Sequence, residues 1–362
     1  MMLDRAGQLL IILLIEAAVG FPEALYRWVR HPVVWIGALI GGVDAKWNAG
    51  SFARRRVAGC ALVVVLLVVS GGAGVLVNWV AAQARAPSMD LPACVSQPGL
   101  RACGPAPGVS PEFHFPVGDG FATLLVILIA TTGLAQRSLR DHVVAVSRPL
   151  QAGDLGAARV AVARIVGRDT ETLDAEGVSA AAIESLAESF CDGIVAPAFW
   201  FLVAGLPGLF ICKAINTADS IVGHKDARHR AFGWAAARAD DVMNWLPARL
   251  AGLFICIAGI GSPVATAGDA GRVRALLNGL RTMLRDAHKH ASPNAGWPEA
   301  AMAGVLSRQL GGPVSYDGEL TDRPVFGTGP HPNAASLRTA LSVYWRACAL
   351  LWLFVAAIAW AA

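Results

Sequence analysis

Residues 213–249 place carboxylates, amides and cations between two apolar stretches of an otherwise hydrophobic chain. Charge at or inside a membrane is costly, so a cluster of this kind is a functional-site hypothesis by default. Adjacent Asp240 and Asp241, with Asn244 about one helical turn later, offer the oxygen ligands that Mg²⁺ prefers beside water and substrate phosphates. Together with Asp219, the two aspartates are the expected metal ligands, and phosphate-dependent chemistry is their expected use.

Four cations and one amide in the same segment extend this hypothesis. Lys213 and Asn216 share one face if the segment is helical, and Lys225 follows a break that contains a glycine. Fixed cations beside a glycine suit a phosphate or several carboxylates. Taken alone, such a run is more often a charged anchor at a membrane surface. The density of acids, amides and cations favours a binding site, with Arg238 and Arg249 as its further cations.

A second acidic pattern precedes this segment. Glu184, Glu188 and Asp192 lie four residues apart, which puts the carboxylates along one slowly drifting face of a helix. A solvated helix face would explain an isolated pair of glutamates. Here the stripe continues directly into the apolar sequence GIVAPAFW, so its last acid lies where the chain meets the membrane. We therefore expect the three carboxylates to be catalytic.

A polar loop further along the chain adds one more amide. The sequence HKHASPNAGWPEAAMAG (288–304) must turn sharply at its Gly and Pro residues before an alanine-rich helix. Asn294 in that turn is a candidate for direct substrate contact. Glu299 would fall in the first turn of the helix, where a partner of the helix dipole and a catalytic acid are equally good interpretations.

The elements that must position these groups are membrane helices. Hydrophobic residues make up 55% of the 362 residues, charged residues make up only 15%, and the mean hydropathy is +0.52. These values exceed those of a soluble domain and predict an all-α, polytopic integral membrane bundle, with a single domain over 1–362. Roughly 20 apolar residues cross the hydrocarbon core. The expected spans are 3–21, 57–82, 118–136, 194–212, 246–267 and 341–362.

Two of the expected spans are interrupted by proline. Pro207 interrupts 194–212, and Pro247 interrupts 246–267. If both stretches crossed the bilayer, the cations between them would lie on the outer side, against the positive-inside rule. Proline at membrane depth usually marks a kinked or re-entrant helix, so we expect re-entrant or tilted helices here. The first stretch, 3–21, lacks the cleavage site of a secretory signal and is interpreted as a retained span.

The distribution of basic residues predicts the orientation. Residues 83–117 contain only Arg85 and Arg101, whereas the other connecting segments are rich in Lys and Arg. The positive-inside rule makes 83–117 the outward loop and places the site on the cytoplasmic side of a bacterial inner membrane. Cys94 and Cys103 in that loop could be bridged, which the sequence leaves open. Amphipathic cytoplasmic helices are expected in 137–193 and 268–340.

Several common motifs are absent from the sequence. The chain has no GxxxxGK[ST] phosphate loop, no GxGxxG dinucleotide motif, no HExxH and no nucleophile elbow. No spacing of cysteine and histidine matches a structural zinc site. Any ATP chemistry must therefore use another architecture. We expect no nucleic-acid partner and no permanently bound cofactor.

Longer motifs resemble those of a known family, the cobalamin-biosynthesis adenosylcobinamide-phosphate synthases of the membrane. Their order and spacing match from near His31 to about residue 330. Ser189 departs from the family pattern, which has asparagine there, and its hydroxyl can replace only one of the amide's two partners. The matching motifs are VGRDT (166–170), IESLAESFCDGIVAPAFW (183–200), KAINTADSIVGHK (213–225), FGWAAARADDVMNWLPARL (232–250), SPNAGWPEAAMAG (292–304) and LGGP (310–313).

The resemblance implies ATP-dependent amide synthesis in cobalamin biosynthesis. The f-side carboxylate of adenosylcobyric acid would be joined through an acyl phosphate to (R)-1-aminopropan-2-ol, free or as its O-phosphate, giving adenosylcobinamide or its phosphate. ATP would be a cosubstrate with Mg²⁺, and the partners would be membrane lipid and possible soluble enzymes of the pathway. Acids would hold Mg²⁺ and accept the ammonium proton, while cations would bind phosphate and amides would orient the corrinoid.

The resemblance assigns two sets of residues. The catalytic set is Glu184, Glu188, Asp192, Asp219, Asp240 and Asp241. The binding set is Lys213, Asn216, Lys225, Arg238, Asn244, Arg249 and Asn294. Two other classes stay open. A transporter of a corrinoid or another anion would also have broken helices around a charged midsection, although inverted-repeat hydropathy is missing. A scaffold that docks soluble enzymes would need no Mg²⁺ ligands.

Overall fold

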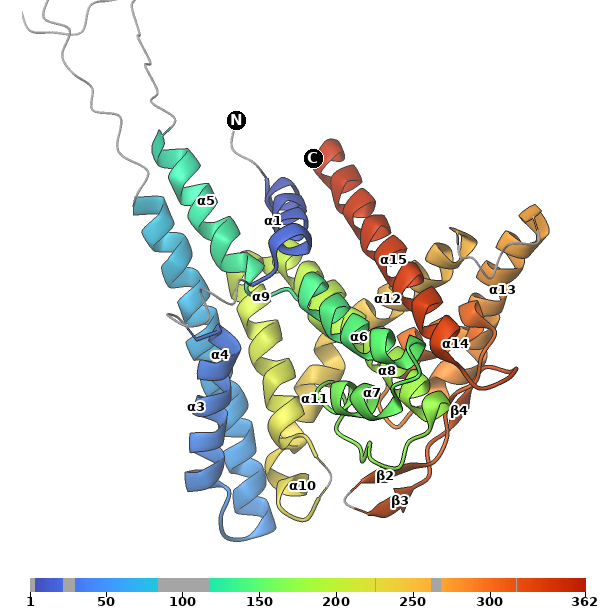
Figure 1. Ribbon diagram of the computed structural model, residues 1–362. Coiled ribbons are helices and arrows are strands. Elements are labelled where there is room, and N and C mark those ends of the chain that lie inside the picture. The colour runs from blue at the N-terminus through green and yellow to red at the C-terminus, as the bar shows by residue number, and fades with distance from the viewer. Residues whose placement is uncertain (1–3, 22–29, 84–116, 225, 262–267, 317) are drawn as a thin grey trace, which may run out of the picture.

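The computed structural model describes residues 4–21, 30–83, 117–224, 226–261, 268–316 and 318–362. Helices dominate these residues, which confirms the all-α class (Figure 1). The described helices are α1 (Arg5–Val19), α3 (Pro32–Trp47), α4 (Phe52–Gln83), α5 (Val117–Thr131), α6 (Gln136–Gln151), α7 (Leu155–Val162), α8 (Ala175–Phe190), the π-helix η1 (Cys191–Val195), α9 (Ala196–Val222), α10 (His229–Phe232), α11 (Trp234–Met243), α12 (Trp245–Ala258), the 3-10 helix η2 (Gly259–Gly261), α13 (Gly268–Asp286), the 3-10 helix η4 (Ala287–Lys289), α14 (Gly296–Leu306) and α15 (Ala334–Ala361).

Four helical stretches in the described part of the chain are long and apolar enough to cross a membrane. They are α4, α5 with α6, α8 with α9, and α15; a fifth is possible if the bent pair α11 and α12 forms one span. Only 22% of the most apolar window of α4 is buried inside the protein. Its outward side chains include Val57 and Val68, which are 70% and 68% exposed. An apolar surface of this kind is suited to lipid contact.

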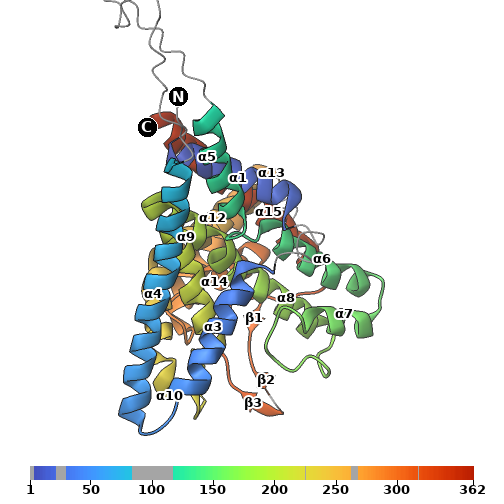
Figure 2. The ribbon, with the colours of Figure 1, turned by 90° about the vertical axis from the view of Figure 1, so that its left-hand side faces the viewer.

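The helices form two packed groups that share α9 (Figures 1 and 2). The larger hydrophobic core involves α1, α8, the first half of α9, α12, α14 and α15. The smaller core joins α3, α4 and α11 to the second half of α9. In Figure 1, α10 lies at the end opposite the C-terminus and the start of α1.

Helix α9 reverses direction at Gly205. A straight helix would place residues 24 positions apart about 36 Å from each other. Instead, Asn216 Nδ2 lies 3.2 Å from Asp192 Oδ2, although the two residues are 24 positions apart in the chain. The stretch 194–212 therefore lies in a helical hairpin and not in one straight helix, and its re-entry into a membrane stays a prediction.

A glycine and a distant arginine make this reversal possible. Gly205 has φ 65° and ψ −149°, a conformation that glycine adopts without steric cost. Pro207 follows and removes one backbone donor just past the turn. The reversal leaves carbonyl groups at the end of the first helical half without helical partners. Arg5 Nη1 donates to the carbonyl oxygen of Val203 at 2.8 Å and fastens the tip of the hairpin to α1.

The hairpin tip packs closely on α4. A Cβ atom at Gly74 would lie 2.5 Å from the backbone nitrogen of Pro207, so only glycine permits the observed approach. Lipid tails are as apolar as hydrophobic side chains, so the hydrophobic effect does not hold membrane helices together. Small residues at a helix interface let the two backbones approach closely enough to pack. The lack of a side chain at Gly74 therefore allows the close approach of the hairpin tip to α4.

Two other expected spans stay predictions. Helices α11 and α12 are bent by 50° relative to each other, but this bend precedes the stretch 246–267, and 262–267 lies outside the described residues. Helix α1 has 15 residues, or roughly 22 Å, so the span 3–21 stays a prediction. The outward loop 83–117, with Cys94 and Cys103, lies almost wholly outside the described residues.

The segment 268–340 is less helical than expected. Two short antiparallel pairs interrupt it: β1 (Leu310–Gly311) with β4 (Val325–Phe326), and β2 (Val314–Tyr316) with β3 (Glu319–Thr321). Glycines with positive φ, such as Gly311 and Gly327, let the chain turn between these pieces. They fold the segment back over α8 and α14, next to the predicted site.

Candidate functional site

The structure brings the two acidic patterns together around Asn216. Asn216 Nδ2 donates to Asp192 Oδ2 at 3.2 Å and to Asp240 Oδ1 at 3.5 Å. These residues come from η1, the second half of α9, and α11. The hairpin makes the contact possible because it returns α9 past η1. Glu188 and Lys213 lie beside this centre, where their charges act on Asp192.

The π-helix η1 displaces Asp192 from a regular helix. A π-turn has one more residue than an α-turn, and such bulges are frequent at functional sites. Glu184 and Glu188 remain on α8, whereas Asp192 belongs to η1. The three carboxylates predicted to share a face thus stay near one another, but each meets different neighbours.

Three aspartates come close enough for their charges to interact: Asp219 on the second half of α9, and Asp240 and Asp241 on α11. The charge of Asp219 interacts with that of Asp241, and the charge of Asp240 interacts with both. Arg238 Nη2 lies 2.9 Å from Asp241 Oδ2 and offsets one of the three negative charges. Uncompensated carboxylates at short range repel one another, so the group would be stabilised by a bound cation.

Amides surround these aspartates. Asn244 Nδ2 donates to Asp240 Oδ2 at 2.9 Å, while its own Oδ1 is buried and has no hydrogen-bond partner among the described residues. Asn294 Nδ2 donates to the carbonyl oxygen of Asp241 at 2.8 Å. Arg249 Nη1 lies 3.4 Å from Asn294 Oδ1, and this guanidinium also stacks on Trp245 and Trp297. The sequence-predicted amides therefore join the aspartates in one region.

Glu184 has a different environment from the other predicted acids. Its oxygens are hydrogen-bonded by Arg168, by Arg323 Nη1 at 3.4 Å and by the backbone nitrogen of Gly311 at 2.7 Å. The residue is 2% exposed. Two guanidinium groups and an N–H hold this carboxylate in a fixed position, and its catalytic role stays a prediction. Through these contacts, Glu184 connects α8 to residues 310–326, the strand segment, which contains the four short strands.

Sequence reasoning did not assign several charged residues of this region to the site. Arg168 and Arg323 form ion pairs with Glu184. Glu299, in the same charged cluster, has no exposed surface. His290 Nε2 is 3.7 Å from Glu299 Oε1. Burial raises the pKa of Glu299, and the negative charges of Glu188 and Glu184 raise it further. Arg168 is part of VGRDT, the one signal that pointed to it; Arg323 lies in no motif.

The expected metal and phosphate ligands are only partly tested by geometry. Among the described residues, no three His, Cys, Asp or Glu side chains are arranged as a metal site. Mg²⁺ commonly binds through one or two carboxylates plus water and phosphate, so a complete protein cage is not required. Lys225 lies outside the described residues. Asp219, Asp240 and Asp241 fit such an open site because their charges are close and incompletely balanced.

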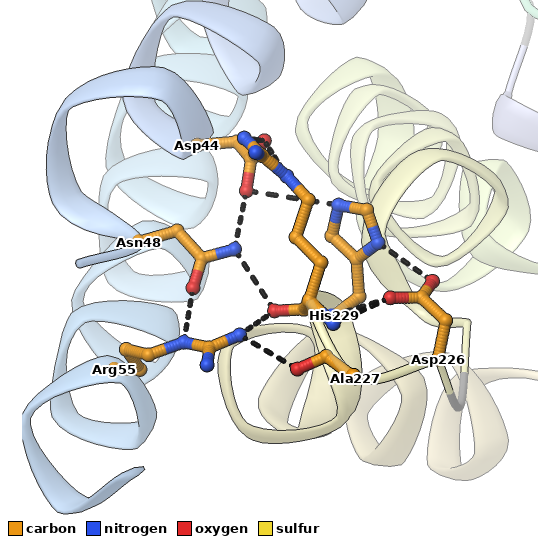
Figure 3. A network of polar contacts seen from close by, with 7 residues as sticks. Asp44, Asn48, Arg55, Asp226, Ala227 and His229 are labelled. Carbon is orange, nitrogen blue, oxygen red and sulfur yellow. Dashed lines mark hydrogen bonds and ion pairs between the residues drawn. The ribbon is translucent and has the colours of Figure 1, made fainter. Parts of the chain in front are cut away.

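A second charged network lies at the far end of the smaller helix group (Figure 3). Asp44 Oδ2 accepts from Arg228 Nη2 at 2.5 Å, and Asn48 Nδ2 donates to Asp44 Oδ1 at 2.7 Å. Asp226 Oδ2 is 2.8 Å from His229 Nδ1. Hydrogen bonding to His229 lowers the pKa of Asp226 to about 2. The network links α3 and α4 to the loop between α9 and α10, and we refer to it as the α3–α10 network.

Comparisons with known proteins agree with the motifs. The family profile described as CobD/Cbib protein matches residues 9–344. A relative named cobalamin biosynthesis protein CobD, from a strain of Rhodobacter capsulatus, is 44% identical over 99% of this chain and 98% of its own length. Relatives of the same name from Sinorhizobium sp and Rhizobium meliloti (strain 1021) are 40% and 37% identical, each over 97% of this chain and over 97% and 96% of their own lengths. No solved structure matches the chain.

Proposed function

Since this chain belongs to the CobD/CbiB family of cobalamin biosynthesis proteins, we propose that it is an amide-forming ligase. The reaction joins the f-side carboxylate of adenosylcobyric acid to (R)-1-aminopropan-2-ol, or to its O-phosphate, with hydrolysis of ATP. The observation that carries this proposal is the meeting of Asp192, Asn216 and Asp240 from three separate elements. Acids, amides and cations gathered in this way match the demands of acyl activation and amine addition.

The residues of the site divide by their chemistry. Asp219, Asp240 and Asp241 would hold Mg²⁺, which supplies charge neutralisation to the phosphates of ATP. Lys213, Arg238 and Arg249 bind phosphate oxygens by charge-assisted hydrogen bonds. The free Oδ1 of Asn244 accepts from a substrate amide, and Asn294 orients another. Remaining carboxylates accept the ammonium proton of the amine.

Membrane location belongs to the same proposal. The apolar helices support a membrane protein, and the basic residues favour a bacterial inner membrane with the site on the cytoplasmic side. Single cysteines introduced at His224 and Asn294 would both react with a labelling reagent from the cytoplasmic side. Labelling of either position from the outer side would contradict a shared cytoplasmic site. The proposed partners are the two substrates, lipid and soluble pathway enzymes.

One assay separates the ligase from its rivals. The purified protein in detergent is supplied with adenosylcobyric acid, aminopropanol phosphate and Mg-ATP, and the amide product is sought by mass spectrometry. A parallel reaction contains free aminopropanol and decides which amine is used. The re-entrant hairpin would also suit a transporter. A transporter or scaffold gives no product in either reaction, and that result would reject the ligase.

A further inference from the structure

Glu299 is buried without adequate partners. It has no exposed surface, and neither carboxylate oxygen makes a hydrogen bond among the described residues. The nearest basic side chains lie beyond hydrogen-bond distance. Arg323 Nη2 is 3.7 Å from Oε2, and His290 Nε2 is 3.7 Å from Oε1. A buried carboxylate without hydrogen bonds is destabilising, so its retention needs an explanation other than packing.

Glu188 is the accessible member of the same cluster. Groups from several segments surround it, since its charge interacts with those of Arg323, Glu184, Asp240 and Arg168. Its side chain is nevertheless exposed. Glu184, one helical turn away, has its oxygens occupied by Arg168, Arg323 and Gly311, as described above. Of the two α8 glutamates, Glu188 is therefore the one free to receive a ligand.

The charges around Glu299 do not balance. The charged groups that face it are the carboxylates Glu184 and Glu188 and the guanidinium groups Arg168 and Arg323. Arg323 Nη2 lies 3.4 Å from His290 Nε2, and the backbone nitrogen of Ser292 donates to His290 Nδ1 at 2.9 Å. Whenever Glu299 is ionised, three carboxylates meet two guanidinium groups and one negative charge has no partner, which together with burial is why the pKa of Glu299 is raised.

We propose that Glu188 binds the ammonium group of the amine substrate and that Glu299 is the positioning residue behind it. This inference rests on the proposed function and names the subsite for its second substrate. A primary ammonium group carries the one positive charge that the cluster lacks, and it has three N–H donors for carboxylate oxygens. An ammonium group at Glu188 supplies the missing positive charge and favours the ionised form of Glu299, whose carboxylate then helps to hold the cation.

The proton balance of the reaction follows from this placement. The ammonium group gives one proton to the Glu188 carboxylate, which leaves a neutral amine and a carboxylic acid. The amine lone pair then forms the C–N bond with the acyl phosphate of adenosylcobyric acid, and the C–O bond to phosphate breaks. The second proton lost by nitrogen leaves with the departing phosphate. ATP, the cosubstrate of the proposed reaction, supplies the acyl phosphate.

Kinetics of glutamine variants tests both roles. Glu188→Gln should raise KM for the amine at least tenfold, and kcat should fall by about a hundredfold or more because the proton acceptor is lost. Glu299→Gln should raise KM for the amine by about threefold to tenfold and leave kcat within about threefold, because the neutral amide no longer helps to hold the cation. Glu299→Asp, which keeps the carboxylate, should bring KM back toward the wild-type value.

Matched controls and a binding measurement make the test decisive. Glu319→Gln, on the exposed strand β3, should leave KM and the pH profile unchanged. Calorimetry with 1-aminopropan-2-ol and with propane-1,2-diol should show binding of the amine alone in the wild type and loss of that binding in Glu188→Gln. An unchanged KM and unchanged amine binding in Glu188→Gln would overturn the subsite. An unchanged KM for the amine in Glu299→Gln would overturn the role of Glu299.

The binding measurement also separates this inference from the ligase proposal. If amine binding depends on Glu188 but no amide ever forms, the subsite stands and the ligase fails. If amide forms at the wild-type rate in Glu188→Gln, the ligase stands and the subsite fails.

Discussion

The α3–α10 network can be compared with the candidate site around Glu188, Asp192, Asp240 and Glu299, which we call the carboxylate site. Both contain several charges, but the charges are balanced differently. In the α3–α10 network, Asp44 receives hydrogen bonds from Arg228 and Asn48, and Asp226 receives them from His229 and backbone nitrogens (Figure 3). In the carboxylate site, acids outnumber their partners, and buried oxygens of Glu299 have no hydrogen bond among the described residues.

The difference teaches how to separate structure from chemistry in a polar cluster. A satisfied network stabilises a fixed arrangement of helices, and nothing needs to be added to it. An unsatisfied cluster is costly unless a ligand completes it. Substitutions should therefore mainly affect stability in the α3–α10 network and mainly affect turnover in the carboxylate site.

The largest effect is expected at the aspartates of the site. Asp219→Asn and Asp241→Asn should each reduce turnover below detection, or by at least about a hundredfold, because the cation-binding charge is lost. The folded protein should persist, since removal of one of several repelling charges costs little stability. Product formation by mass spectrometry and thermal unfolding in detergent measure the two quantities. Wild-type rates in both variants would contradict the assignment.

The hairpin that carries half the site should be next in sensitivity. Gly205→Ala forces an L-residue into φ 65° and should cost about 1–3 kcal/mol of folding free energy. The nearest atom to the added Cβ is Arg5 Nε at 3.8 Å, so the cost is conformational and not a clash.

A glycine elsewhere in the bundle provides the control for this change. Gly72→Ala in α4 adds a methyl group with nothing within 4 Å and should be neutral or stabilising by up to about 1 kcal/mol. Thermal unfolding of the two variants side by side gives the answer. Equal stability of Gly205→Ala and Gly72→Ala would show that the reversal at Gly205 does not need a glycine.

The α3–α10 network should respond through stability. Asp44→Ala removes the acceptor for Arg228 and Asn48 and should cost about 1–2 kcal/mol. Turnover measured well below the unfolding temperature should stay within about threefold of wild type, an effect of less than 1 kcal/mol on the barrier. A loss of turnover as large as that of Asp219→Asn would erase the distinction between the two regions.

The smallest expected effect is on the stability of the protein at low pH. The pKa of Asp226 is lowered to about 2 by its hydrogen bond with His229, whereas an unfolded aspartate titrates near 3.9. Its stabilisation is therefore fully present above about pH 4 and is lost as the pH falls toward 2. Asp226→Asn should flatten this part of the stability curve. Unfolding temperatures at pH 5 and pH 3 should differ less in the variant than in the wild type, and equal differences would contradict the role.

Much of the site could be predicted from the sequence because its residues lie in long motifs. Asn216, Asp240 and Asn294 were expected to share one site, and each contacts another predicted residue or its backbone. A re-entrant stretch was also expected, from the conflict between its cations and the positive-inside rule. The position of the reversal was not predicted. The breaks were expected at the prolines, whereas the residue with the unusual backbone conformation is Gly205.

Other features depend on contacts that no local pattern encodes. The catalytic role of Glu184 stays a prediction, and its hydrogen bond from Arg323, 139 positions away, could not be predicted from helical spacing. The lone charge of Glu299 likewise depends on which groups from α8 and the strand segment reach it. Helical spacing gave the face of each glutamate but could not give its partners, since partners are a property of tertiary packing.

The reversal at Gly205 also bears on how the protein is made. A continuous helix through this region would have required the insertion machinery to export Lys213 and the charged residues after it through hydrocarbon. Because the chain turns back, the second half of α9 can return to the side where it was synthesised and dock against α4. With the proposed cytoplasmic orientation of the site, biogenesis of the protein then needs no transfer of those charges through lipid.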